Sequence, residues 1–165
     1  MKNFFNRFKQ SLVQGQKYEQ YIKKLMVDYG WDFLYFNDNY KFDIMMTNKK
    51  DELVTIEVKS DDKSYYTNNL YIEYESWNKP SGVMATTANF FIYVLPKHNQ
   101  IWFMRTSDLK HAIIDYNPEI NNTNLCWMKV KGGDGKKTKG YLWNMNNLKE
   151  VLGNKLKIIN KNNII

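Results

Sequence analysis

Alternation of hydrophobic and polar residues predicts a series of short strands along the chain. In the run VTIEVKS, Val54, Ile56 and Val58 lie on one face, and the polar residues between them lie on the other. Strand side chains point alternately to the two faces of a sheet, so this run is expected to be half-buried. The expected strands are 31–36, 40–47, 52–60, 66–77, 89–96, 100–105, 125–130 and 140–145.

Helical spacing of apolar residues appears in two clear places. From about Ser11 to Tyr29, hydrophobic residues recur at intervals of three and four, and Gly30 ends the pattern. A second helix is predicted over 106–116, with Thr106 or Ser107 as its cap.

Neither a repeat nor a linker interrupts the chain, so residues 1–165 are expected to form a single domain with a sizeable core. Residues 1–10 are expected to be a loosely ordered arm. A weak helix begins near Asn146, and residues 153–165 form a Lys/Asn-rich tail. The mixture of helices and strands predicts an α/β (α+β) fold with a partly antiparallel sheet.

Composition points to a soluble protein with a basic surface. Hydrophobic residues make up 43%, and no apolar run approaches the roughly 20 residues of a membrane helix. No membrane partner is expected, and the absence of an export signal makes the cytoplasm the expected location. The net charge of +7 favours polyanions such as nucleic acid, although many basic proteins bind none.

The few cysteines and histidines narrow the possible chemistry. Cys126 is the only cysteine, so neither a disulfide nor a cysteine-based zinc site can form within the chain. His98 and His111 are far apart in the sequence. Metal binding or proton transfer must therefore depend on carboxylates and lysines.

The turn NKKD joins two predicted strands that carry acidic residues. If the turn centres near Lys50, Asp43 lies directly opposite Glu57, with Cβ atoms roughly 5 Å apart. Two carboxylates at this distance repel each other, and a hard divalent cation such as Mg²⁺, with Mn²⁺ as a substitute, removes the repulsion. Lys59 lies on the same face. A register slip of one residue would separate these side chains.

These residues predict metal-assisted hydrolysis of a phosphodiester. Asp43 and Glu57 would hold the metal, which lowers the pKa of a bound water and neutralises charge on the phosphate. Lys59 would hold or activate the attacking water, or stabilise the charge that develops on the phosphorane. Its pKa is expected to be lowered by burial and by the metal. Glu19, on the first helix, either completes the metal shell or pairs with Lys23 on the helix flank.

The spacing of Asp43, thirteen residues, then Glu57-Val58-Lys59 resembles the D…(D/E)-x-K signature of the PD-(D/E)xK nuclease superfamily. Glu19 matches the additional acidic residue that many members carry, and Phe42 stands where the motif has proline. The resemblance covers about residues 15–95. It implies a restriction-endonuclease-like core with a mixed central sheet flanked by helices, and Mg²⁺-dependent hydrolysis that leaves 5′-phosphate and 3′-hydroxyl ends. A likeness to junction resolvases would imply a homodimer.

The segment NLYIEYESWNKPSGVMATTANFFIYV is similar to uncharacterised, often phage- or virus-encoded nucleases of this superfamily, which carry an E…KPSG…TT run. The matching residues are Glu73, Lys79, Ser81, Gly82, Thr86 and Thr87. Glu73 and Glu75 share a strand face and could extend the acidic site, while the lysine and the hydroxyls could donate to phosphates. Equally, the run is a loop shaped by Pro and Gly whose threonines cap a helix.

The glycine-rich run KGGDGKKTKG supplies lysines that could hold a phosphate backbone, or it is a solvated hairpin tip. The lysines concerned are Lys136, Lys137 and Lys139. Exposed aromatics such as Tyr65, Tyr66 or Trp77 could stack on bases.

The small size of the chain favours structure-selective or weakly specific cutting. The expected function is a Mg²⁺-dependent endonuclease acting on DNA. The alternatives are a catalytically inactive nuclease-fold module that binds nucleic acid or protein, and a structural or interaction protein such as a phage-encoded inhibitor.

Overall fold

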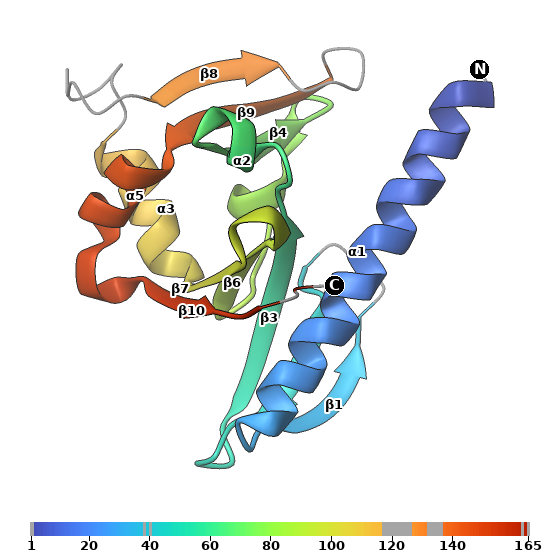
Figure 1. Cartoon of the computed structure of the whole chain (residues 1–165), viewed down its shortest axis with the longest axis vertical. Helices are drawn as coiled ribbons and strands as arrows, with labels where there is room; N and C mark the ends of the chain where they lie inside the picture. The colour runs from blue at the N-terminus through green and yellow to red at the C-terminus, as the bar shows by residue number, and fades with distance from the viewer. Residues whose placement is uncertain are drawn as a thin grey trace.

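Two sheets and the helices around them make up the computed structural model of this chain (Figure 1). It describes residues 2–37, 39, 41–116, 127–131, 137–162 and 164, with the backbone alone over 2–10 and 127–129. Its helices of more than one turn are α1 (Lys2–Asp28), α3 (Thr106–Asp115) and α5 (Met145–Leu152), and α2 (Ser64–Thr67) is a single turn. Short 3₁₀ turns are η1 (Gly82–Met84), η2 (Pro96–His98) and η3 (Gly153–Lys155).

The larger sheet is mixed, and helices flank it. Its six strands lie in the order β1-β2-β3-β6-β7-β10; β3 and β6 run parallel, and all other neighbours run antiparallel. These strands are β1 (Asp32–Phe36), β2 (Ile44–Thr47), β3 (Leu53–Ser60), β6 (Phe90–Leu95), β7 (Gln100–Arg105) and β10 (Lys157–Asn160). The predicted mixture of helices with a partly antiparallel sheet is therefore confirmed.

The smaller sheet is antiparallel and lies in the order β5-β4-β9-β8. Its strands are β4 (Asn69–Ser76), β5 (Lys79–Pro80), β8 (Trp127–Lys131) and β9 (Thr138–Asn144). The strand predicted over 66–77 is shorter than expected, since its first residues belong to α2. The expected loop 78–82 contains β5 because Trp77 and Asn78 form a two-residue turn.

A first core lies between α1 and one face of the larger sheet. Tyr18, Ile22, Leu25 and Met26 of α1 are buried against β3, where Val54, Ile56 and Val58 point toward the helix, as the alternation predicted. Because side chains alternate along a strand, the residues between these three point to the opposite face.

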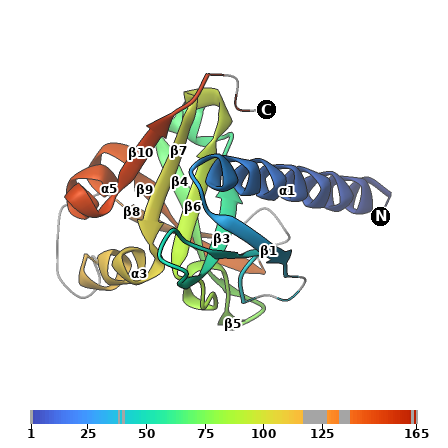
Figure 2. The ribbon, with the colours of Figure 1, turned by 90° about the horizontal axis from the view of Figure 1, so that it is seen from below.

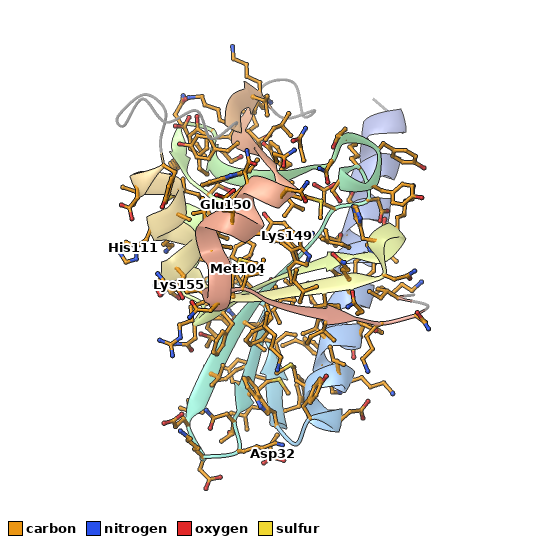
Figure 3. The ribbon with its side chains drawn as sticks, turned by 60° about the vertical axis from the view of Figure 1, so that its left-hand side comes forward. Asp32, Met104, His111, Lys149, Glu150 and Lys155 are labelled. Atoms are coloured by element: carbon orange, nitrogen blue, oxygen red, sulfur yellow. The ribbon has the colours of Figure 1, made fainter. Side chains whose placement is uncertain are left out.

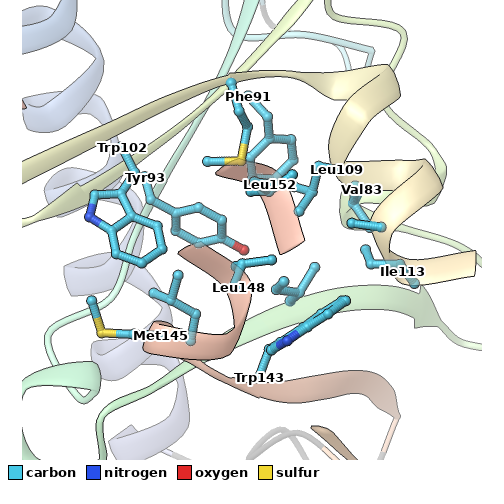
Figure 4. Close-up of a cluster of buried hydrophobic side chains, with 14 of the residues drawn as sticks. Val83, Phe91, Tyr93, Trp102, Leu109, Ile113, Trp143, Met145, Leu148 and Leu152 are labelled. Atoms are coloured by element: carbon cyan, nitrogen blue, oxygen red, sulfur yellow. The ribbon is translucent and has the colours of Figure 1, made fainter. Parts of the chain in front are cut away.

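A second core fills the space between the two sheets and is closed by α3 and α5 (Figure 4). Phe91 and Tyr93 of β6 and Trp102 of β7 contribute to it, together with Trp143 of β9 and Leu148 of α5. α3 and α5 lie side by side (Figure 3), and Lys155 Nζ is 3.4 Å from Asp108 Oδ1. The polar face of β3 is thus turned toward the smaller sheet.

The prediction that residues 1–10 form a loosely ordered arm is wrong, because α1 begins at Lys2. The helix extends past the larger sheet at its N-terminal end (Figure 2). Leu12 and Val13 are exposed there, and no proline interrupts the helix.

Two predictions for the second half of the chain are also wrong. The expected tail contains β10, which pairs with β7 at the sheet edge. α3 has Arg105 at its cap position without a side-chain cap bond, so neither Thr106 nor Ser107 caps it. None of the described helices combines the length and the apolarity needed to cross a membrane.

Candidate active site

The hairpin of β2 and β3 has the predicted register. Ile44 pairs with Ile56, so Asp43, one residue before β2, is aligned with Glu57. Ile44 and Ile56 are fully buried in the core below α1. The neighbouring Asp43 and Glu57 therefore share the opposite face, which is turned toward the smaller sheet.

Local hydrogen bonds in the turn fix this register. Asn48 Oδ1 accepts from the amides of Lys50 (2.8 Å) and Glu52 (3.1 Å), and Asp51 has a positive φ of 59°. Asparagine commonly bonds to the backbone two residues ahead, and aspartate tolerates the left-handed region. The NKKD sequence therefore determines which residues of the two strands face each other.

Asp43 is half-buried and held by the backbone of β3. Its Oδ2 accepts the amide of Val58 at 2.7 Å. Burial raises the pKa of Asp43, the charge of Glu57 raises it further, and Lys59 and the Val58 amide offset part of the rise. The ionised carboxylate is thus destabilised in the folded protein, as expected for two acidic groups placed side by side.

Glu57 is buried, with 6% of its surface exposed, and both carboxylate oxygens have partners. Oε1 lies 2.5 Å from Lys59 Nζ, and Oε2 accepts the hydroxyl of Thr86 at 3.1 Å. A buried carboxylate with two such contacts is held in one orientation.

The Lys59 side chain is 42% exposed, while its Nζ lies against Glu57 Oε1. Burial acts to lower the pKa of Lys59, but the charges of Glu57, Asp43 and Glu73 together raise it above its ordinary value. The predicted lowering of this pKa is therefore wrong for the protein without bound metal. Lys59 stays protonated at neutral pH.

Glu73 of β4 lies close enough for its charge to act on Lys59. Ser81 Oγ donates to Glu73 Oε1, and Gly82 lies directly against the backbone of Glu73. Gly82 has a φ of +51°, and an added Cβ would meet the Cβ of Glu73 at 2.9 Å. The KPSG run therefore packs onto the strand that carries Glu73, and its serine orients the carboxylate.

Thr86 is part of the site, but in a different role from the one predicted. It is 1% exposed, and its hydroxyl contacts Lys41 O (2.8 Å) and Glu57 Oε2. A side chain this deeply buried has no surface with which to meet a phosphate, so the predicted nucleic-acid contact is corrected to positioning of Glu57. Thr87 is exposed, and its amide donates to Lys41 O at 2.9 Å.

Glu19 does not join the acidic group. It lies on α1, whose buried residues pack against the face of β3 opposite to Glu57. Among the residues that the structure describes, no three His, Cys, Asp or Glu side chains are grouped as a metal site would need. A metal would be held by Asp43 and Glu57.

The predicted nucleic-acid lysines lie at one end of the smaller sheet. Lys139 forms an ion pair with Glu75. The pairing of β4 with β9 shifts in register between Glu73 and Glu75, so the strand face predicted for both is interrupted there. Lys79 and Lys137 are exposed near the β4–β5 turn, while Lys136 lies outside the described residues.

Two residues that the sequence analysis did not select also border the site. Tyr93 is buried, its hydroxyl donates to Tyr71 O at 3.2 Å, and burial followed by the charges of Asp61, Glu73 and Glu57 raises its pKa well above the ordinary value. Asp61 Oδ1 accepts the amide of Ser64 at the start of α2 (3.0 Å). The spacing of Asp61 and Ser64, three residues apart, is typical of a side chain that caps the first turn of a helix, and it was the sequence signal for Asp61.

Comparisons of the chain with protein-family models, with curated proteins and with solved structures found no match. The function is therefore inferred from the geometry and charge of the site.

Proposed function

We propose that this protein is a Mg²⁺-dependent nuclease that hydrolyses phosphodiester bonds in DNA. The observation that carries the proposal is the alignment of Asp43 with Glu57 on one strand face, with the Lys59 ammonium 2.5 Å from Glu57. The arrangement agrees with the resemblance of these residues to the PD-(D/E)xK nucleases.

The charge of the group favours a divalent cation. Asp43, Glu57 and Glu73 all act on the single ammonium of Lys59, so the negative charge of the carboxylates is only partly balanced. The raised pKa of Asp43 shows that its ionisation is costly in the absence of further positive charge. Carboxylate oxygens suit Mg²⁺, with Mn²⁺ as a substitute, and both Asp43 and Glu57 are oriented by bonds to the protein.

The residues divide the chemistry among them. Mg²⁺ bound by Asp43 and Glu57 would supply a water of lowered pKa and neutralise charge on the scissile phosphate. Lys59, kept protonated by the carboxylates, would bind a phosphate oxygen and stabilise the negative charge that develops there. Thr86 keeps Glu57 in place through its hydroxyl. The raised pKa of Lys59 therefore favours an electrostatic role over that of a general base.

The basic chain supports DNA as the substrate. The net charge is +7, and Lys79 and Lys137 are exposed on the sheet that also supplies Glu73. Lysines of this kind bind phosphates without reading the base sequence. We propose structure-selective cutting, and a homodimer if both strands of a junction are cut.

The test measures cleavage of linear, supercoiled, single-stranded and four-way-junction DNA with Mg²⁺, Mn²⁺ or EDTA. Asp43→Asn, Glu57→Gln and Lys59→Met are each expected to lower the rate by about 10²-fold or more. The matched control is Glu150→Gln, since Glu150 is an exposed carboxylate on α5. Rates unchanged in all three site variants, or cleavage that persists in EDTA, would contradict the proposal.

A second candidate is a catalytically inactive module that keeps the fold and binds DNA. It is favoured by the finding that, among the described residues, no three His, Cys, Asp or Glu side chains are grouped so that they could hold a metal. DNA binding that weakens with salt, combined with no metal-dependent cleavage of any substrate, would select this candidate.

A further inference from the structure

The turn between β4 and β5 carries a tryptophan in an unusual backbone conformation. Ser76 pairs with Lys79, so Trp77 and Asn78 are the two turn residues, with φ of 52° and 58°. Two-residue turns with positive φ at both positions favour asparagine, aspartate and glycine. Asn78 fits this preference. A bulky aromatic residue at the position of Trp77 does not, so turn geometry does not explain it.

The Trp77 ring lies in solvent with a lysine over it. The residue is 64% exposed, although tryptophan is highly buried on average. Lys137 Nζ is 3.6 Å from the ring centroid, and the Trp77 amide donates to Lys137 O at 2.9 Å. Lys79, the next residue but one, is also exposed. The turn therefore presents an aromatic surface beside two positive charges.

The same hairpin is connected to the carboxylate group. Pro80 pairs with Glu75, and the next residue, Ser81, donates to Glu73. Glu73 in turn acts on Lys59. Gly82 packs against the Glu73 backbone and fixes the hairpin relative to β4. The turn is thus attached to β4, the strand that carries Glu73.

We infer that Trp77, Lys137 and Lys79 form a platform on which an unpaired base of single-stranded DNA stacks, with its neighbouring phosphates on the two lysines. Bases stack on exposed aromatic side chains through their ring faces, and an ammonium near the ring adds to the attraction. Within a duplex those faces are covered by neighbouring base pairs, so the platform selects unpaired nucleotides. The inference rests on the proposed function and deepens it, since it assigns a substrate with a single-stranded segment.

The test measures binding of a labelled single-stranded oligonucleotide, and of the matching duplex, to the full chain in EDTA. Trp77→Ala is expected to weaken single-strand binding about tenfold or more, to leave duplex binding nearly unchanged, and to preserve the circular dichroism spectrum. Trp77→Phe keeps an aromatic face and is expected to retain most of the affinity. The control is Tyr29→Ala, which removes an exposed aromatic residue that has no proposed contact with nucleic acid.

Tryptophan fluorescence provides a second readout. Trp102 and Trp143 are fully buried, whereas Trp77 is exposed. Single-stranded DNA is expected to quench the emission of the wild-type chain, and Trp77→Phe is expected to lose that part of the quenching. Loss of affinity for single strand and duplex to the same degree, or equal losses in Trp77→Ala and Tyr29→Ala, would overturn the inference.

The use of EDTA separates this inference from the nuclease proposal. A wild-type chain that cleaves DNA while Trp77→Ala binds single strands normally would overturn the platform alone. Trp77-dependent binding to single strands without metal-dependent cleavage supports the platform and overturns the nuclease proposal.

Discussion

Replacement of Gly82 by alanine tests the packing that holds the KPSG run against the site. Gly82 has a φ of +51°, and a Cβ there would lie 2.9 Å from the Cβ of Glu73 and closer still to the Glu73 carbonyl oxygen. Backbone atoms of β4 cannot turn away as the end of a side chain can. Either β4 or η1 must therefore move, and Glu73 and Ser81 move with them.

Two contributions set the expected loss of stability. A left-handed conformation costs an alanine about 1–2 kcal/mol, and overpacking adds about 1–3 kcal/mol. The sum, about 2–5 kcal/mol, is a large part of the roughly 5–15 kcal/mol that stabilises a domain. Gly153 is the comparison, since it has the same φ of +51°, with a ψ of −125°, and no atom lies within 4 Å of an added Cβ. Gly153→Ala should therefore lose the conformational part alone.

Urea unfolding followed by circular dichroism measures both variants. The midpoint is expected to fall further for Gly82→Ala than for Gly153→Ala, and DNA cleavage by the folded protein should fall only for Gly82→Ala. Equal midpoint shifts would show that Gly82 does not pack closely on Glu73. Normal cleavage by Gly82→Ala would separate the KPSG run from the site.

Three further changes test other parts of the structure. Asp43→Asn should raise stability at pH 7. The pKa of Asp43 is higher in the folded protein than its ordinary value of 3.8, so native stability falls as the pH rises from 3.8 through the folded-state pKa. Unfolding measured across this pH range should give the variant a flatter stability profile than the wild type, and a variant less stable than the wild type at pH 7 would refute the reasoning. Thr86→Val keeps the shape but removes the hydroxyl from Glu57, so it should cost about 1–3 kcal/mol and lower the cleavage rate, whereas Thr86→Ser should retain both stability and activity. Deletion of residues 157–165 should cost about 2–4 kcal/mol, since β10 contributes two half-buried isoleucines, and an unchanged melting temperature would show that this segment is only a tail.

The parts of the fold predicted from sequence are those determined by local pattern. The β2–β3 register was predictable because NKKD forms its turn through Asn48, and the alternation of β3 gave the face of each side chain. The N-terminal part of α1 was missed because its polar residues were read as interrupting the helical pattern before Ser11. β10 was missed because a Lys/Asn-rich segment does not indicate its pairing with β7.

For the candidate site, the sequence predicted which residues of the hairpin lie together, but not their surroundings. Asp43, Glu57 and Lys59 were found from one hairpin and one motif. The predicted direction of the Lys59 pKa shift was wrong, because the shift depends on how many carboxylates lie near the ammonium. One of them, Glu73, comes from the other sheet, which the local sequence does not indicate. The burial of Thr86 and the placement of Glu19 across the sheet both follow from tertiary packing, which no local pattern encodes.

The connection between β3 and β6 explains why this surrounding matters to the chemistry. Parallel neighbours require a crossover, and here the chain leaves β3 after Lys59 and returns to β6 through α2, β4, β5 and η1. That crossover brings Glu73 to Lys59 and the Thr86 hydroxyl to Glu57. The hairpin alone would place two repelling carboxylates beside one ammonium. The crossover adds a third negative charge and restrains Glu57, so the proposed cation would offset more repulsion than the hairpin alone creates.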